Sequence, residues 1–280
     1  MTSTKPPKLK LLSGNTKLDK GSKMGWLNIG LSFAPNDMSG RQVCPFASKG
    51  CKEACLESAG RGRMANVANA RIKKTLDFYA DKQAYLKLIS ADIAMAEAWC
   101  KVHDFKLAVR LNVLSDIRWE NERFNKSGLN MFETYSSVQF VDYTKDFKKM
   151  MKWCKGELPS NYHLTFSRSE VNDLLCNQVL ENGGNVATVF RPMGKIVNVK
   201  VKDKKSGKTY TSKRFKTTDP KIKKRTFDTP SEWGAYKVFN GDNSDLRHLD
   251  PKGVIVGLRA KGEAWVDKSG FVVDFGGEAL

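Results

Sequence analysis

The feature that most constrains the fold is the alternation of short apolar segments with longer helix-like segments. Candidate strands recur along the chain at residues 26–33, 106–113, 138–143, 162–166, 185–190, 236–239 and 253–258. Helix-like stretches separate several of them, at residues 58–102 with a break near Asp81, at 146–155 and at 170–181. Strands that alternate with helices are typical of βα units on a parallel sheet. The pattern therefore predicts an α/β protein.

A complete or partial (β/α) barrel of the TIM type is the expected form of this sheet, because barrels of this length are commonly single domains. The competing layout is an open doubly wound sheet. The first strand is not followed by a G-x-G-x-x-G loop, which argues against a dinucleotide-binding sheet. We expect one domain over residues 24–280, preceded by a flexible basic tail over residues 1–23.

Two segments carry most of the formal net charge of +18. Residues 1–23 hold six Lys against one Asp, and residues 194–225 hold thirteen Lys or Arg against two Asp. Apolar and polar residues alternate on both sides of Lys205-Ser206-Gly207-Lys208, which predicts a β-hairpin inserted between the βα units. The basic segment 194–225 could bind a nucleic acid or a nucleotide substrate. The alternative is a solvated surface insertion.

Three of the six cysteines, Cys44, Cys51 and Cys55, lie within twelve residues at the spacing C-x6-C-x3-C. They belong to a loop at residues 34–57 that follows the first predicted strand. No apolar run approaches the roughly 20 residues of a membrane span, and the N-terminus lacks the apolar region of a signal peptide. We therefore expect a cytoplasmic protein with no membrane partner, in a reducing compartment where clustered cysteines indicate metal binding more than disulfides.

The donor pattern favours an iron–sulfur cluster. A structural zinc site usually needs a second Cys or His pair, but the histidines at 103, 163 and 248 are isolated in the sequence. Three thiolates on a loop suit a [4Fe-4S] cluster that keeps one iron free of protein sulfur. The isolated cysteines at 100, 154 and 176 are expected to be small buried apolar residues.

Active sites of α/β barrels lie at the carboxyl ends of the strands, and polar residues follow several predicted strands here. From this position we predict catalytic roles for Asp116 and Arg168. We predict cofactor-binding roles for four further residues, Asn112, Ser115, Ser167 and Arg191. The alternative for each is a role in a turn or a helix cap, which Ser and Asp residues fill well.

Several short stretches resemble the bacteriophage family called "gene product 88". They are residues 44–56, 59–62, 70–72, 110–112, 115–117 and 250–253, together with Lys74-Thr75 and Phe78, and the resemblance covers most of residues 25–275. It implies a phage origin, with the host cytoplasm as the place of action, and a cysteine-bound cluster.

Cysteine ligands that are followed at once by a long helix are loosely similar to the radical S-adenosylmethionine enzymes. Those enzymes usually have C-x3-C-x2-C and a Gly-Gly-Glu after the second strand, where this chain has Ser115-Asp116-Ile117. The similarity implies an enzyme that binds S-adenosylmethionine and takes electrons from an external donor. Two alternatives stay open: an iron–sulfur protein with a redox, structural or sensor cluster, and a zinc-stabilised nucleic-acid-binding protein.

Overall fold

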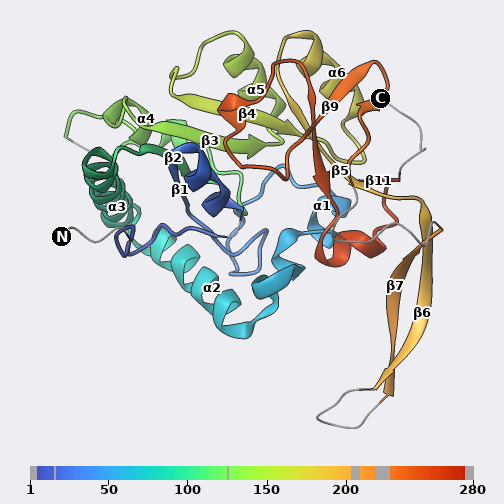
Figure 1. Ribbon diagram of the computed structural model, residues 1–280. Helices are drawn as coiled ribbons and strands as arrows, with labels where there is room; N and C mark the ends of the chain where they lie inside the picture. Colours follow the sequence, from blue (N-terminus) through green and yellow to red (C-terminus); the bar gives the residue numbers. More distant parts are fainter. Residues whose placement is uncertain (1–4, 16, 125, 203–208, 219–227, 275–280) are drawn as a thin grey trace.

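The computed structural model describes residues 5–15, 17–124, 126–202, 209–218 and 228–274 as a mixed α/β fold around a mostly parallel sheet (Figure 1). The strands are β1 (Trp26–Gly30), β2 (Lys106–Arg110), β3 (Gln139–Thr144), β4 (Tyr162–Ser167), β5 (Val186–Arg191), β6 (Gly194–Lys202), β7 (Thr209–Thr217), β8 (Glu232–Trp233), β9 (Tyr236–Asn240), β10 (Ile255–Arg259) and β11 (Val272–Asp274). The helices are α1 (Lys49–Glu53), α2 (Ala65–Ala80), α3 (Lys82–His103), α4 (Met131–Thr134), α5 (Phe147–Cys154) and α6 (Asp173–Glu181). The predicted α/β class is confirmed.

The main sheet has the strand order β1-β2-β3-β4-β5-β10-β9-β8. A further short strand, β11, also pairs with β5. The pairs from β1 to β5 and those of β10 with β5 and β9 are parallel, whereas β8 is antiparallel to β9. All seven predicted strands are present as β1 to β5, β9 and β10. The parallel arrangement brings their carboxyl ends to one edge of the sheet.

The described strands form an open sheet, so the complete barrel is not seen among these residues. Backbone hydrogen bonds occupy the outer edge of β1, because Ser13 pairs with Gly30 at 3.0 and 2.9 Å. At the other end, β8 is two residues long and runs antiparallel to its neighbour. Among the described residues, the sheet thus ends at β1 on one side and at β8 on the other.

The helical stretch breaks near Asp81, as the sequence predicts. The Asp81 carboxylate caps α3 by accepting a hydrogen bond from the backbone N–H of Ala84 at 2.9 Å. Phe33, which follows β1, packs with Phe78 of α2 and Tyr85 of α3 in a buried aromatic cluster. This packing fixes the two long helices against the segment that leads into the cysteine loop.

The described part of the N-terminal stretch lies on the body of the protein. The Asp92 carboxylate on α3 accepts hydrogen bonds from the backbone N–H groups of Lys10, Leu11 and Leu12, at 2.9, 2.6 and 2.9 Å. Leu11, Leu12 and Leu18 are buried. Apolar anchors and a carboxylate that satisfies three backbone donors account for this docking.

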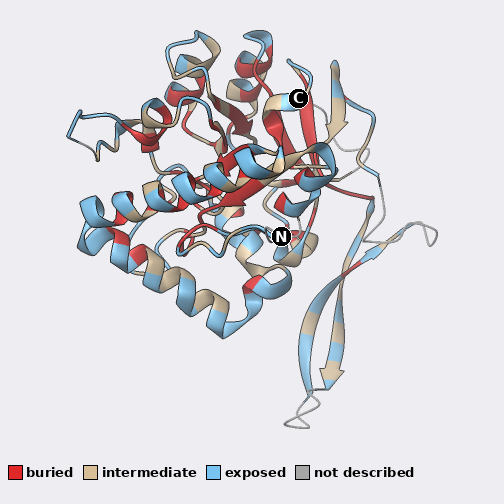
Figure 2. Ribbon diagram, turned by 60° about the vertical axis from the view of Figure 1, so that its left-hand side comes forward, coloured by how far each residue is buried: buried red, intermediate tan, exposed pale blue. Residues whose placement is uncertain are grey.

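The predicted basic hairpin is present as β6 and β7, which pair antiparallel over nine positions and project from the body (Figures 1 and 2). Residues 203–208 and 219–225 of the predicted insertion lie outside the described residues. Within the part of the chain that the structure describes, no helix combines the length and the apolar character needed to cross a membrane.

Candidate functional site

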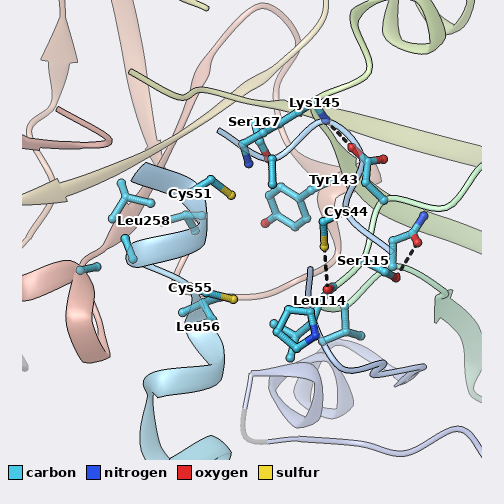
Figure 3. A pocket seen from close by; sticks show the side chains of 18 of the residues that line it. Cys44, Cys51, Cys55, Leu56, Leu114, Ser115, Tyr143, Lys145, Ser167 and Leu258 are labelled. Carbon is cyan, nitrogen blue, oxygen red and sulfur yellow. Dashed lines mark hydrogen bonds between the residues drawn. The ribbon is translucent and has the colours of Figure 1, made fainter. Parts of the chain in front are cut away.

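Cys44, Cys51 and Cys55 line one cavity of about 230 Å³ at the carboxyl ends of the parallel strands. Figure 3 shows their sulfur atoms directed toward the same space. The loop after β2 and Tyr143 of β3 lie opposite the segment that carries Cys51 and Cys55. The fold therefore gathers the three thiols where βα proteins place their active sites.

Cys44 is held by the loops that follow β1 and β2. Its Sγ donates a hydrogen bond to the carbonyl of Leu114 at 3.3 Å and accepts one from the backbone N–H of Asn36 at 3.4 Å. The backbone N–H of Asp116 donates to the Val43 carbonyl at 2.8 Å, which joins the two loops beside the thiol. The position of Cys44 is thus set by backbone groups of both loops.

The short helix α1 carries Cys51, and a carboxylate from the loop after β4 fixes the residues next to it. Ser48 caps α1 by accepting a hydrogen bond from the backbone N–H of Cys51 at 3.2 Å. The Glu170 carboxylate, after β4, accepts a hydrogen bond from the Ser48 hydroxyl at 2.8 Å and one from the Gly50 N–H at 2.7 Å. This carboxylate therefore connects the cysteine loop to the segment that follows β4.

Gly50 is required by close packing. A Cβ at this position would lie 2.2 Å from the Ser269 hydroxyl and 2.8 Å from Cβ of Phe271. Side chains do not approach so closely without displacement, so any larger residue would push α1 away from the segment before β11. The glycine lets the helix that carries Cys51 lie directly against that segment.

Burial controls the protonation of two of the thiols. The pKa of Cys44 and that of Cys55 are each raised to about 11, with burial as the largest cause and the neighbouring cysteines as a smaller one. Lys145 opposes this rise at Cys55 because its positive charge favours the thiolate. All six cysteines are free thiols, and Cys100 and Cys176 are buried away from the cavity, in the core.

Within the described ranges, no group of three or more His, Cys, Asp or Glu side chains is arranged closely enough to hold a metal ion. The three thiols share a cavity without forming a preassembled coordination sphere. The donor chemistry nevertheless fits a thiophilic centre, because sulfur ligands select iron–sulfur clusters, zinc or copper over hard oxygen-loving cations. The predicted metal ligands are therefore placed together, and binding itself stays a prediction.

The cavity lining is rich in cations and holds one carboxylate, Asp116. The cationic residues are Lys17, Arg110, Lys145, Arg259 and Lys261. Lys17 and Arg110 form salt bridges to Asp245 at 3.0 and 2.7 Å, and Arg259 and Lys261 do so to Asp242 at 3.0 and 2.7 Å. Lys145 lies 5.6 Å from the ring centroid of Phe271. Asp242 and Asp245 neutralise part of this charge, and together with Asp116 they leave the five cations in excess, which favours negative charge inside the cavity.

Three predicted residues from the loop after β2 line the cavity, and hydrogen bonds order all of them. Asn112 donates to the Asp142 carboxylate, and its side-chain carbonyl accepts from the Ser115 hydroxyl at 2.8 Å. The Asp116 carboxylate accepts from the Thr144 hydroxyl and the backbone N–H of Lys145, both at 2.8 Å. Burial raises the pKa of Asp116. These contacts give the loop a fixed shape next to Cys44.

Ser167 at the end of β4 also lines the cavity, whereas Arg168 and Arg191 do not. The Arg168 guanidinium forms a salt bridge to Asp173 at 2.7 Å and donates to the carbonyl of Gly270 at 2.7 Å. Arg191 pairs with Asp274 at 2.6 Å. Both guanidinium groups join the main sheet edge to the C-terminal segment, so the structure places these two predicted residues outside the cavity wall.

Some residues that shape the site are missing from the sequence-based prediction. Arg110 is the last residue of β2, and Lys17 belongs to the stretch expected to be a flexible tail. Glu170 follows β4 and fixes the cysteine loop. Proximity to the carboxyl end of a predicted strand is a usable signal for Arg110 and Glu170. For Lys17 no local pattern indicates that a buried partner, Asp245, lies 228 positions further along the chain.

Comparison with known protein families gives one family match, described as Gene product 88, over residues 9–274. This agrees with the resemblance carried by the cysteine loop and the short stretches elsewhere in the chain. No curated protein and no solved structure matches the chain.

Proposed function

The chain belongs to the gene product 88 family, and from this and the geometry of the site we propose that it is an iron–sulfur protein. In this proposal Cys44, Cys51 and Cys55 hold a [4Fe-4S] cluster in the cavity at the carboxyl edge of the sheet. One iron has no protein sulfur ligand and faces the remaining space. The reducing cytoplasm of an infected host would keep the thiols available for the cluster.

The observation that carries the proposal is the convergence of three free thiols on one cavity at the carboxyl edge of a parallel sheet. Cys44 comes from a different part of the loop than Cys51 and Cys55, and separate contacts to Leu114 and Glu170 hold the two parts in place. A purely structural cysteine is more often isolated in the core, as Cys100 is.

The residues around the cavity fit an anionic group. A cluster bound by three thiolates carries negative charge, and the five cationic residues of the lining outnumber Asp116 and the salt-bridge partners Asp242 and Asp245. Iron–sulfur ligation requires thiolates, so Cys44 and Cys55 must lose their protons when the cluster binds. Burial opposes this step because it raises the pKa of both thiols. The Leu114 carbonyl would then lose the hydrogen bond that Cys44 donates.

An open iron on such a cluster supplies electron transfer and a position for a substrate or for S-adenosylmethionine. We propose an enzyme of the radical S-adenosylmethionine kind, on a sheet that represents part of a (β/α) barrel. The uninterrupted order β1 to β5 supports this reading because consecutive neighbouring strands with one direction are how such a barrel is built. Asp116, Asn112, Ser115 and Ser167 would line the space for the cofactor or the substrate.

A second candidate is an iron–sulfur protein without S-adenosylmethionine chemistry. Two observations favour it: the spacing C-x6-C-x3-C, and Ser115-Asp116-Ile117 where the radical enzymes have Gly-Gly-Glu. In this candidate the cluster is redox-active, structural or a sensor, and Asp116 is the carboxylate of the lining that could act as a fourth ligand.

Anaerobic reconstitution with iron and sulfide, followed by electron paramagnetic resonance, tests the proposal. The reduced protein should show a cluster signal, and adding S-adenosylmethionine should change its shape if the open iron binds the cofactor. A signal that S-adenosylmethionine leaves unchanged would support the second candidate. A colourless protein that binds stoichiometric zinc instead would contradict both.

A further inference from the structure

We propose that the ribbon formed by β6 and β7 is a DNA-binding arm that lies in the major groove of duplex DNA and contacts the flanking phosphates. This proposal concerns a surface distinct from the cysteine cavity and does not depend on the cluster. It rests on the charge, the cross-strand register and the shape of the ribbon, taken in turn below.

The described strands of the ribbon carry exclusively positive charge. The six cationic residues, all exposed, are Lys195, Lys200, Lys202, Lys213, Arg214 and Lys216, and neither strand contains Asp or Glu. No salt bridge to any of the six is found within the described ranges. On the body, by contrast, several exposed Lys residues pair with Glu or Asp, as Lys73 does with Asp77. The ribbon is thus a concentrated positive surface.

The register places one pair of like charges directly opposite each other. Lys195 pairs with Lys216 across the ribbon, on one face, and Arg214 is two residues from Lys216 on the same face. Like charges at opposite positions destabilise a sheet, so this pair does not itself stabilise the ribbon. An anion that bridges the two cations, such as a phosphate, would convert the repulsion into attraction.

The shape of the ribbon suits a groove in double-stranded DNA. Two strands about 5 Å apart with side chains on both faces fit the major groove, which is about 12 Å wide and admits a two-stranded β-ribbon. Nine residues per strand span roughly 30 Å, close to one turn of the double helix. The deep, narrow major groove of double-stranded RNA does not admit such an element.

The base of the ribbon packs against the body of the protein through one buried aromatic residue. Phe215 of β7 is buried and packs against the Trp265 ring, with centroids 5.4 Å apart. The Arg191 guanidinium lies 5.2 Å from the Phe215 ring centroid and donates to the Trp265 carbonyl. Trp265 is next to Ala264, which lines the cysteine cavity, so the base of the ribbon lies beside the cavity wall.

Equilibrium binding of a fluorescent 20-base-pair DNA duplex to the full chain, measured by anisotropy at several salt concentrations, tests the arm. The test variant is K195Q/K200Q/K213Q/K216Q. The matched control removes four exposed lysines of the body, K87Q/K148Q/K152Q/K155Q. We expect the test variant to bind at least 30-fold more weakly at 0.1 M salt and its slope of log K against log salt to fall by about 3 to 4.

The control should keep the wild-type slope within about 1, because its lysines lie outside the arm. The single variants K200Q and K213Q should each lower the slope by about 1, so the test does not depend on the fourfold variant keeping its fold. Equal losses in the test and control variants would overturn the proposal. So would an undetectable wild-type affinity, or tighter binding of single-stranded DNA, double-stranded RNA or anionic vesicles than of the duplex.

Discussion

The Glu170 carboxylate accepts a 2.7 Å hydrogen bond from the backbone N–H of Gly50, although 120 positions of sequence separate the two residues. Gly50 directly precedes Cys51, and Glu170 follows β4. The second carboxylate oxygen accepts from Ser48, the residue that caps α1. One side chain thus fixes the helix that carries Cys51 relative to the sheet edge, and it has no part in holding Cys44.

Replacing Glu170 should loosen the cysteine loop. In E170A the Gly50 N–H and the Ser48 hydroxyl lose their acceptor, and we expect the reconstituted cluster to be lost to a chelator at least 5-fold faster than in the wild type, because a less ordered ligand costs binding free energy. Absorbance during chelation provides the measurement. E170Q keeps one acceptor oxygen and should recover part of the difference, and E181A, on the exposed end of α6, serves as a control. Equal rates in all three variants would contradict a positioning role.

The pair of cations on Asp245 predicts a large loss of stability in D245N. Asp245 is buried and forms salt bridges to Lys17 and Arg110, and these cations hold the pKa of its carboxyl group far below the ordinary value. Removing its charge leaves two mostly buried cations unpaired, so the free energy of unfolding should fall by about 3 to 5 kcal/mol in urea titrations. The exposed pair of Lys73 and Asp77 gives the control D77N, which should change it by less than about 1 kcal/mol. Similar values for both variants would show that the buried cluster is not structurally important.

The histidine on β4 predicts a loss of stability in acid. Burial lowers the pKa of His163 to about 3, so the folded protein keeps this side chain neutral while the unfolded chain binds a proton below about pH 6.5. The free energy of unfolding should therefore fall by about 1.5 to 2 kcal/mol for this group as the pH decreases from 6.5 to 5. His248, whose pKa burial lowers to about 4, acts in the same direction.

The variant H163F isolates this contribution because Phe fits beside the Trp153 ring, which contacts His163 with centroids 4.9 Å apart. Asp142 and Asp250, whose pKa values burial raises to about 6, stabilise the fold as the pH falls, and they do so equally in both proteins. The difference in unfolding free energy between H163F and the wild type should shift in favour of the variant from pH 6.5 to pH 5. A difference that is independent of pH would contradict a neutral His163 in the folded protein.

Much of the fold could be predicted because local patterns determine it. The seven predicted strands are present, and the break at Asp81 coincides with a helix cap that Asp residues commonly form. The sequence left a barrel and an open sheet as alternatives, because the bridge between Ser13 and Gly30 and the reversed direction of β8 are tertiary features that no local pattern indicates. The same holds for Lys17, whose partner Asp245 is distant in the sequence.

For the site, the cysteine spacing indicated three neighbouring thiols, and the fold places them at one cavity with Asn112, Ser115, Asp116 and Ser167. Position after a strand was too coarse to distinguish Ser167 from Arg168. Arg168 lies one residue beyond the end of β4, and its guanidinium reaches Asp173 and the carbonyl of Gly270 outside the cavity wall. Arg191 is likewise committed to Asp274.

Iron and acid-labile sulfide per chain, determined after anaerobic reconstitution of the wild type and of single Cys-to-Ala variants, test the central claim most directly. We predict about four iron and four sulfide per wild-type chain for a [4Fe-4S] cluster. Each of C44A, C51A and C55A should lose most of both, whereas C100A, C154A and C176A should keep them. Wild-type protein without iron, or retention of the cluster in C51A together with its loss in C100A, would contradict the assignment of these three thiols as ligands.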